Sequence, residues 1–422
     1  MSYCAIDFGT SNSAIVLPHA EGMRLATVEN GRRTLPTAVF FNADEHTQSY
    51  GRAALAAYIE GHHGRLMRSI KSILGSALAQ TSTDMGNGSA IRYTDVIALF
   101  LAHLKRRAEA EGSTPLLRAV LGRPVFFVDD DPRADAQAEQ QFADAARAVG
   151  FREIVFQYEP IAAAFDYEAR LADEQRVLVA DIGGGTSDFS LVRVGPRRRA
   201  RAARRDDVLA HHGVHVAGTD FDRRVALAAI QPALGYRSID TQGREMPSRL
   251  YFDLATWHLV NTVYTPRRAA ELRLMRHLFR DPAHHARAMR VVEHRLGHAL
   301  LAQAEQAKIA VSAGGTTRIG LDAVEPGLHA DFDAPALVDA SRDDTARIVE
   351  AARDTARLAG VREETISALY FTGGSTGLEH LTGAIARAFP HAHAVFGDRL
   401  ASVATGLGIH ARRVFGEAGG DA

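Results

Sequence analysis

Apolar residues form short runs at the start of the chain and again in its middle, and a loop of glycine, hydroxyl and aspartate residues interrupts each run. The first loop spans residues 7–13 and is followed by Ala14-Ile15-Val16. The second spans residues 181–188 and is followed by Phe189-Ser190-Leu191-Val192. Because apolar residues follow each loop directly, both patterns predict β-hairpins and not strand-to-helix turns.

The rest of the chain alternates between strand and helix patterns. We predict strands over residues 120–128, 154–158, 208–216, 368–371 and 394–396. We predict helices over residues 132–149, 160–172, 292–312, 343–359, 378–389 and 402–415. Asp129, Asp130 and Asp131 precede Pro132, so we interpret them as a helix cap and not as a metal cluster.

The hairpin pattern occurs twice, a domain's length apart, which predicts a duplicated α/β architecture with a cleft between two lobes. We expect the lobe I core in residues 1–36, 112–174 and 400–422, with an insertion over 37–111. We expect the lobe II core in residues 175–221 and 313–399, with a mostly helical insertion over 222–312.

Composition restricts the class of protein. The 422 residues carry a formal charge of −1 and are 46% hydrophobic, which is typical of an ordinary globular chain and gives no general case for nucleic-acid binding. No apolar run is long enough to cross a membrane. The chain enters a strand without a basic leader, which favours a cytoplasmic location. Its single cysteine, Cys4, lies in an apolar strand pattern, and we expect a buried thiol.

The two loops carry the chemistry. An aspartate at the end of a strand can hold a hydrated metal ion, and the glycine and hydroxyl residues after it let backbone N–H groups approach phosphate oxygens. The chain contains no G-x-x-x-x-G-K-[ST] loop, and Gly183-Gly184-Gly185 does not fit G-x-G-x-x-G. The pair of loops therefore predicts a polyphosphate site of a different architecture.

Lysine is almost absent, since only Lys71, Lys105 and Lys308 occur among 49 basic residues. A retained lysine can mark a place where a compact ammonium contacts a phosphate. The arginine-rich segment 197–205 could meet nucleic acid or acidic lipid, but flanking strands favour a solvated hairpin tip. The histidine pairs lack companions at zinc-site spacing, so we expect no metal there.

Taken in order, the motifs resemble the ATPase domain of DnaK-type heat-shock chaperones of the 70-kDa class, which belong to the actin-like and sugar-kinase-like superfamily. Seven segments carry the resemblance: residues 7–13, 68–75, 158–164, 181–188, 217–222, 305–308 and 373–376. The resemblance implies an actin-like fold, in which each lobe has a five-stranded sheet with helices and an insertion. ATP would lie at the bottom of the cleft.

The resemblance also implies roles for individual residues. Asp7 and Asp181 would hold Mg²⁺ through water. The catalytic group would comprise Lys71, Glu159, Asp181, Asp188 and Thr10. In it, Glu159 would order the metal's shell, and Lys71 would place the attacking water. Residues that would contact ATP or ADP are Gly9, Thr10, Ser11, Asn12, Gly183, Gly184, Gly185, Thr186, Gly218, Glu305, Lys308, Ser312, Gly373, Gly374 and Ser375. A surface ion pair between Glu305 and Lys308 is the alternative reading of that helix.

The chain departs from the family pattern at two arginine positions. Ile309 and Gly377 stand where the chaperones usually have arginines beside the adenine, which predicts weaker nucleotide binding or relaxed base preference. After the last predicted helix we expect no linker, peptide-binding sandwich or lid, and the sequence looks most like short YegD-type relatives.

Three functions follow from these observations. The first is a slow Mg-ATP hydrolase of the heat-shock 70 type whose lobe closure is read by a protein client or co-chaperone. The second is a small-molecule kinase of the same superfamily, with Asp188 as its base. The third is an actin-like scaffold in which ATP is structural.

Overall fold

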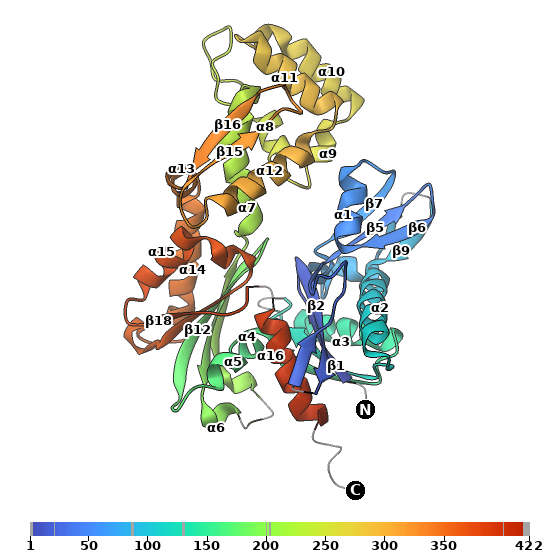
Figure 1. Ribbon diagram of the computed structural model, residues 1–422, viewed down its shortest axis with the longest axis vertical. Helices are drawn as coiled ribbons and strands as arrows, with labels where there is room; N and C mark the ends of the chain where they lie inside the picture. The colour runs from blue at the N-terminus through green and yellow to red at the C-terminus, as the bar shows by residue number, and fades with distance from the viewer. Residues whose placement is uncertain are drawn as a thin grey trace.

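The computed structural model describes residues 3–20, 22–85, 88–128, 131–199, 201, 204–399 and 401–416 (Figure 1). Asp129 and Asp130 of the predicted cap and the terminal residues 417–422 lie outside this part of the chain. Asp131 caps its helix as predicted, because its carboxylate accepts hydrogen bonds from the Arg133 and Ala134 N–H groups, each at 3.0 Å.

Lobe I is built on a mixed sheet of order β11-β10-β1-β2-β3, with β4 beside β2. Its strands are β1 (Tyr3–Phe8), β2 (Asn12–His19), β3 (Gly22–Leu25), β4 (Leu35–Pro36), β10 (Arg118–Arg123) and β11 (Glu153–Tyr158). Its helices are α3 (Pro132–Ala148), α4 (Glu159–Ala163), α5 (Phe165–Glu168) and α16 (Ser402–Ala411). β1 and β2 are antiparallel partners, which confirms the first predicted hairpin.

Lobe II is built on a five-stranded sheet of order β14-β13-β12-β17-β18. Its strands are β12 (Gln175–Ile182), β13 (Ser187–Val194), β14 (Val208–Val214), β17 (Ala368–Thr372) and β18 (His393–Phe396). Its helices are α6 (Pro196–Arg199), α7 (Gly218–Val225), α13 (Ala334–Ala340), α14 (Arg342–Leu358) and α15 (Glu379–Ala388). β12 and β13 form the second predicted hairpin, with Asp181 opposite Asp188.

Period-2 alternation assigns each strand's side chains to two different cores. In β1, Cys4 and Ile6 pack toward the outer helices of lobe I, whereas Ala5 packs toward the centre of the molecule. Burial of Cys4 is confirmed, and it raises the pKa of the thiol. In β12, Val177 and Val179 also face the centre.

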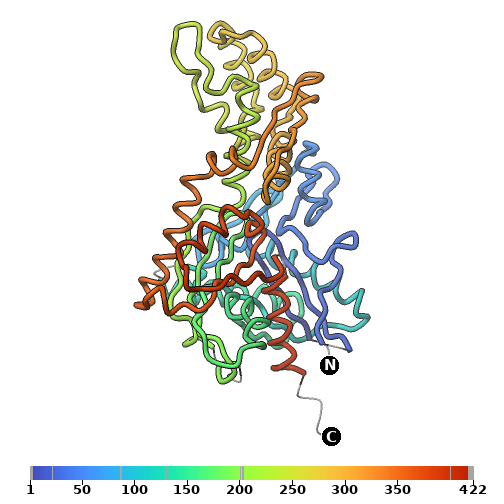
Figure 2. Tube along the Cα trace, turned by 60° about the vertical axis from the view of Figure 1, so that its left-hand side comes forward, coloured from blue at the N-terminus to red at the C-terminus, as the bar shows by residue number. Residues whose placement is uncertain are grey.

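The central core joins the two lobes. Helices α4, α5 and α16 lie between the two sheets in Figure 1, and one hydrophobic cluster contains residues from both sheets and from these helices. Figure 2 shows α16 running alongside the first strands. The loops at the strand ends are therefore carried by two sheets with a shared buried support.

Each lobe carries an insertion at the opposite end of the molecule from the termini (Figure 1). Helix α2 (Tyr93–Gly112), predicted mostly as part of the first insertion, packs against β2 and α3 of lobe I. The first insertion contains β5 (Ala38–Asn42), β6 (Thr47–Tyr50), α1 (Gly51–Ile59), β7 (Gly64–Arg68), β8 (Ser82–Asp84) and β9 (Ala90–Arg92). The second contains α8 (Arg249–Leu254), α9 (Val260–Val263), α10 (Pro266–Leu274), α11 (Pro282–Glu293), α12 (Gly297–Ala310), β15 (Thr316–Gly320) and β16 (His329–Asp333).

Several predicted boundaries are wrong. The strand predicted over 120–128 runs from Arg118 to Arg123, because Pro124 has no N–H for the ladder. The helix predicted over 160–172 is divided into α4 and α5. It ends at Glu168, whose buried carboxylate accepts a hydrogen bond from the Gly195 N–H at 3.0 Å. The strand predicted over 208–216 ends at Val214.

The helix predicted over 292–312 is two helices, α11 and α12. Arg295 has a left-handed backbone, with φ of 53°, and so ends α11. Gly297 begins α12, and its N–H donates to the Tyr264 hydroxyl at 2.8 Å. A side chain at Gly297 would bring its Cβ within 2.7 Å of that hydroxyl, so the break permits close packing.

The arginine-rich segment is not wholly a solvated tip. Arg204 is buried, and its guanidinium donates to Glu168 at 2.8 Å and to Asp207. Arg198 donates to Asp207 at 2.9 Å and to Glu174 at 2.7 Å. Two of the arginines therefore fasten the β13–β14 connection to lobe II and to α5. Of the helices in the described ranges, none is both long and apolar enough to span a bilayer.

Candidate functional site

The two hairpin loops meet each other across the cleft. A Cβ added to Gly184 of the second loop would lie only 2.8 Å from the Ser11 Oγ of the first. The first loop is held by Thr37, whose hydroxyl donates to the Gly9 carbonyl at 2.7 Å and whose N–H donates to the Ser11 carbonyl at 2.9 Å. Thr10 and Asn12 flank Ser11 in the same turn. The loops predicted from the sequence thus face one another from opposite lobes.

Other predicted residues of lobe II converge on the second loop. The Gly183 carbonyl accepts hydrogen bonds from the Gly218 N–H at 3.2 Å and from the Ser375 hydroxyl at 2.7 Å. The Gly183 N–H donates to the Thr186 carbonyl at 3.0 Å, which closes the turn around Gly185. The N–H and hydroxyl of Thr219 both donate to the Gly184 carbonyl, at 2.8 and 2.9 Å. These bonds fix the loop before any ligand is present.

Lys71 reaches the base of the cleft from the first insertion. It lies in a 3₁₀ turn over Ile70–Ile73, and its Nζ donates to Glu159 Oε1 at the start of α4. The side chains of Lys71 and Glu159 are 8% and 16% exposed, so the pair is largely removed from water. The structure brings together the predicted lysine and glutamate, which are 88 residues apart in the sequence.

Two predicted metal-site aspartates lie beside this pair. Burial, followed by the charge of Glu159, raises the pKa of Asp7 to about 8. Burial, followed by the charges of Asp188 and Glu159, raises the pKa of Asp181 to about 7. Lys71 opposes both increases. Four carboxylates with one neighbouring ammonium make a site that favours an added cation.

The donor chemistry fits Mg²⁺ held through water. Within the described ranges, no three His, Cys, Asp or Glu side chains are placed to hold a metal ion by themselves. Mg²⁺ prefers oxygen ligands and usually keeps several waters alongside one or two carboxylates and substrate phosphates. Asp7 and Asp181 offer that kind of donor set from the two lobes.

Asp188 lies at the rim of the same site. Its side chain is 42% exposed, and the Thr186 hydroxyl donates to its Oδ2 at 2.7 Å. The negative charge of Asp188 raises the pKa of Asp181 on the neighbouring strand, so the two carboxylates interact. Asp188 can therefore face a ligand without being a buried member of the carboxylate group.

The residues of the 305–312 segment predicted to contact adenosine do not all lie on one face of α12. Lys308 is buried in α12 and pairs with Asp222 Oδ1 at 2.7 Å, so the alternative pairing with Glu305 is wrong. Lys308 Nζ also donates to the Gly218 carbonyl at 3.3 Å, which connects α12 to the second loop. Glu305 is exposed. Ser312 lies beyond α12, and its carbonyl accepts from the Glu379 N–H at 3.2 Å.

Gly373 precedes and Gly374 begins a 3₁₀ turn over Gly374–Gly377 at the end of β17. A Cβ at Gly373 would lie 2.7 Å from Asp181 Oδ1, so this turn touches the carboxylate group. At Gly377, where the family pattern has an arginine, the guanidinium of Arg399 fills the adjoining space. Its Nη1 lies 2.7 Å from the position of a Cβ on Gly377. A guanidinium from another segment therefore lies directly beside position 377.

Three residues beside the site were missed in the sequence. Asp222 holds Lys308, Thr37 holds the first loop, and Arg399 adjoins Gly377. Asp222 lies four residues after Gly218 in the segment 217–222, which the sequence analysis singled out. The sequence did not indicate that its partner is Lys308. Neither Thr37 nor Arg399 belongs to a motif that sequence spacing would reveal.

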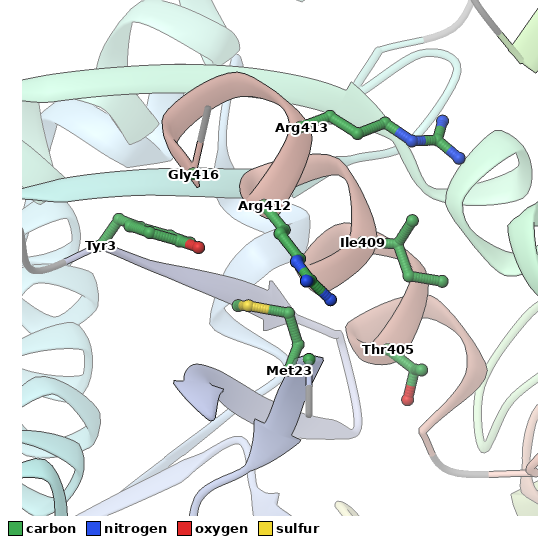
Figure 3. Close-up of a pocket in the computed structure, with 8 residues that line it drawn as sticks. Tyr3, Met23, Thr405, Ile409, Arg412, Arg413 and Gly416 are labelled. Atoms are coloured by element: carbon green, nitrogen blue, oxygen red, sulfur yellow. The ribbon is translucent and has the colours of Figure 1, made fainter. Parts of the chain in front are cut away.

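A cavity of about 720 Å³ lies elsewhere, between β3 and the C-terminal helical segment that begins with α16 (Figure 3). It is lined by Tyr3, Gly22, Met23, Thr405, Ile409, Arg412, Arg413 and Gly416. Figure 3 shows Met23 and Arg412 pointing toward each other between β3 and α16. None of the predicted site residues lines this cavity.

Two mixed α/β lobes, each presenting a glycine–aspartate hairpin to the cleft, define the actin-like ATPase fold. Residues 3–250 match the HSP70 family, described as Hsp70 protein. The chain belongs to the Hsp70 family. It is 29% identical over 299 residues to a protein named chaperone protein HscA homolog from Laribacter hongkongensis (strain HLHK9). The match covers 64% of this chain and 45% of that relative, so the chain spans less than half the length of the curated relative it matches.

Proposed function

We propose that the protein binds Mg-ATP between its two hairpin loops and hydrolyses it slowly. The observation that carries this proposal is the close approach of the Ser11 hydroxyl to Gly184, beside the Lys71–Glu159 pair. Phosphoryl transfer needs positioning and charge neutralisation more than covalent help. The converging N–H groups, hydroxyls and single ammonium supply both.

In this proposal each group has one task. The backbone of Gly184–Thr186 binds the β- and γ-phosphates, and Gly183 and Gly218, whose N–H groups donate within lobe II, shape the loop around them. Glu159 keeps the Lys71 ammonium fixed, and this ammonium places the attacking water and neutralises charge on the γ-phosphate. Asp7 and Asp181 hold Mg²⁺ through water, and the ion neutralises phosphate charge when bound. Thr10 and Asp188 line the approach of the water.

The base and ribose are assigned to the second half of the site. Lys308, fixed by Asp222, and Ser375, fixed by the Gly183 carbonyl, provide polar groups beside the phosphate loop. Arg399 offers a planar guanidinium next to Gly377, on which a base can stack. We accordingly assign part of base recognition to Arg399, although position 377 itself has no arginine.

We infer that lobe closure is the signal that a partner reads. The two insertions already touch across the top of the cleft, where the Arg68 guanidinium lies 4.9 Å from the Trp257 ring centroid. The Tyr58 ring meets His298 edge-on at 5.1 Å in the same contact. A protein client or co-chaperone that distinguishes open from closed lobes would couple to ATP through these contacts. The relative's name, chaperone protein HscA homolog, supports this class of partner.

The single tryptophan makes the proposal testable. Trp257 fluorescence should change when ATP and Mg²⁺ are added, and phosphate should be released slowly and only when Mg²⁺ is present. A chelator should abolish the release. Phosphate release that continues unchanged in excess chelator would contradict the assigned role of the ion.

The same assay separates the alternatives. A kinase would release ADP only when an acceptor is added and would release no phosphate. A scaffold would raise light scattering on addition of ATP. The proposal predicts phosphate release without acceptor and constant light scattering.

A further inference from the structure

The face shared by β13 and β14 extends the site beyond Asp188. Gly213 lies opposite Asp188 in the ladder, and Ser190 lies opposite His211. Residues two apart on a strand share a face, so the Asp188, Ser190 and His211 side chains lie on one side of the sheet. A Cβ at Gly213 would approach Asp188 Oδ1 to 2.5 Å. The missing side chain therefore gives the carboxylate room to lean over β14 toward His211.

His211 is itself held in one orientation. Its Nδ1 lies 3.0 Å from the Oγ of Ser190, a residue that is 3% exposed. The Phe126 ring meets the imidazole edge-on, with ring centroids 6.3 Å apart. These contacts direct the other nitrogen, Nε2, toward Asp188 Oδ1 at 4.0 Å. The His211 side chain is 10% exposed, whereas the Asp188 side chain is 42% exposed.

The arrangement suits a carboxylate that must keep a fixed direction. Ser190 can donate its hydroxyl proton to Nδ1, which leaves the Nε2 proton facing the carboxylate. The Thr186 hydroxyl then holds Asp188 Oδ2 by a hydrogen bond of 2.7 Å, and the imidazole Nε2 faces Oδ1 at 4.0 Å. Without His211, the Asp188 carboxylate would lose the group that faces Oδ1 and would keep the Thr186 hydroxyl at Oδ2.

We propose that His211 is a positioning residue for ATP hydrolysis and acts through Asp188. This inference rests on the proposed function, because it assigns His211 to the same candidate ATPase site. Asp188 would contact the attacking water, and His211 would set the direction of the Asp188 carboxylate without touching the nucleotide. Errors in placement of this kind reduce turnover more than they reduce binding.

Steady-state phosphate release with Mg-ATP tests the inference. We expect His211→Ala to lower kcat about tenfold and to leave KM within about twofold. His211→Gln keeps an N–H near the position of Nε2 and should recover part of the loss. His212→Gln and His212→Ala are the matched controls, because His212 pairs with Phe189 on the opposite face of the strand and should turn over like the wild type.

A double-mutant cycle tells positioning from a merely structural role. If His211 acts through Asp188, adding His211→Ala to Asp188→Asn should change kcat by less than about twofold. A further tenfold loss in the double variant would overturn the inference. So would a His211→Ala variant with normal kcat.

Two further outcomes keep the test decisive. If His211→Ala does not fold, His211→Gln is compared with His212→Gln by the same kcat measurement, and equal values refute the inference. If the wild-type protein releases no phosphate above the blank, the proposed function itself has failed. If Asp188→Asn slows a working wild type while His211→Ala does not, only the inference has failed.

Discussion

Replacing Lys71 with methionine removes the ammonium but keeps a side chain of similar length. In the structure, Lys71 is the cation that opposes the raised pKa values of both Asp7 and Asp181, and it pairs with Glu159. Lys71→Met leaves these three carboxylates and Asp188 without a neighbouring ammonium. The perturbation therefore acts on the charge at the centre of the proposed site.

The size of the effect follows from the geometry. Two unit charges about 4 Å apart interact by about 4 kcal/mol at an effective dielectric constant of about 20. Removing one fixed donor that stabilises transition-state charge typically costs about 100- to 1000-fold in turnover, or about 3–4 kcal/mol. We expect Lys71→Met to lower kcat by that factor, because the Lys71 side chain is 8% exposed and its partner holds the ammonium in place.

Lys105 provides the matched control. It is also largely buried, with 11% of its side chain exposed, and its Nζ donates to the Val149 carbonyl at 2.8 Å in lobe I. It also lies 4.8 Å from the Phe151 ring centroid, outside the proposed site. Lys105→Met should lower the unfolding temperature but leave kcat unchanged.

Single-turnover phosphate release, Trp257 fluorescence with ATP and thermal unfolding are measured on all three proteins. The account expects a slow Lys71→Met variant that still binds nucleotide. A Lys71→Met variant that hydrolyses ATP within threefold of the wild-type rate would refute the charge argument. Equal losses of kcat in both lysine variants would show a general folding defect.

Three further changes test other parts of the structure. Arg399→Ala should weaken ATP binding about three- to tenfold in calorimetry, since a stacked guanidinium contributes about 1 kcal/mol. Tripolyphosphate, which has no base, should bind unchanged. Equal weakening of both ligands would contradict stacking on the base. Lys308→Met should lower the free energy of unfolding by about 3–5 kcal/mol in urea, because it leaves buried Asp222 unpaired. Adding Asp222→Asn should recover much of this loss, and a further loss would argue against the pair. Burial and then the charges of nearby arginines lower the pKa of His410 from 6.5 to about 4, so neutral His410 stabilises the fold above pH 6.5. That stability, about 3 kcal/mol, is lost as pH falls from 6.5 toward 4. His410→Gln should flatten this part of the urea stability profile, and an unchanged profile would be inconsistent with the assignment.

Local signals predicted the hairpins and the helix cap correctly. Apolar runs on both sides of each loop specify a hairpin, and Asp131 before Pro132 specifies a cap, because neighbouring residues decide both features. The convergence of Lys71 and Glu159 was predicted only through the family resemblance. Nothing in the spacing of two residues 88 positions apart fixes their contact.

What the sequence missed depends on tertiary partners. Lys308 shares a helix with Glu305 but pairs with Asp222, because folding brings the start of α7 against α12. Arg204 belongs to an arginine-rich run that predicts an exposed surface, yet its side chain is buried and pairs with Glu168 and Asp207. The interruption between α11 and α12 is decided by the room that Gly297 leaves for Tyr264. Side-chain charge and helical periodicity carry no information about such partners.

The most direct test of the central proposal is a crystal structure with Mg²⁺ and a non-hydrolysable ATP analogue. The account predicts the phosphates between residues 9–12 and residues 183–186, with the metal's waters bonded to Asp7 and Asp181. An analogue bound in the cavity beside α16, with the two loops empty, would contradict the account.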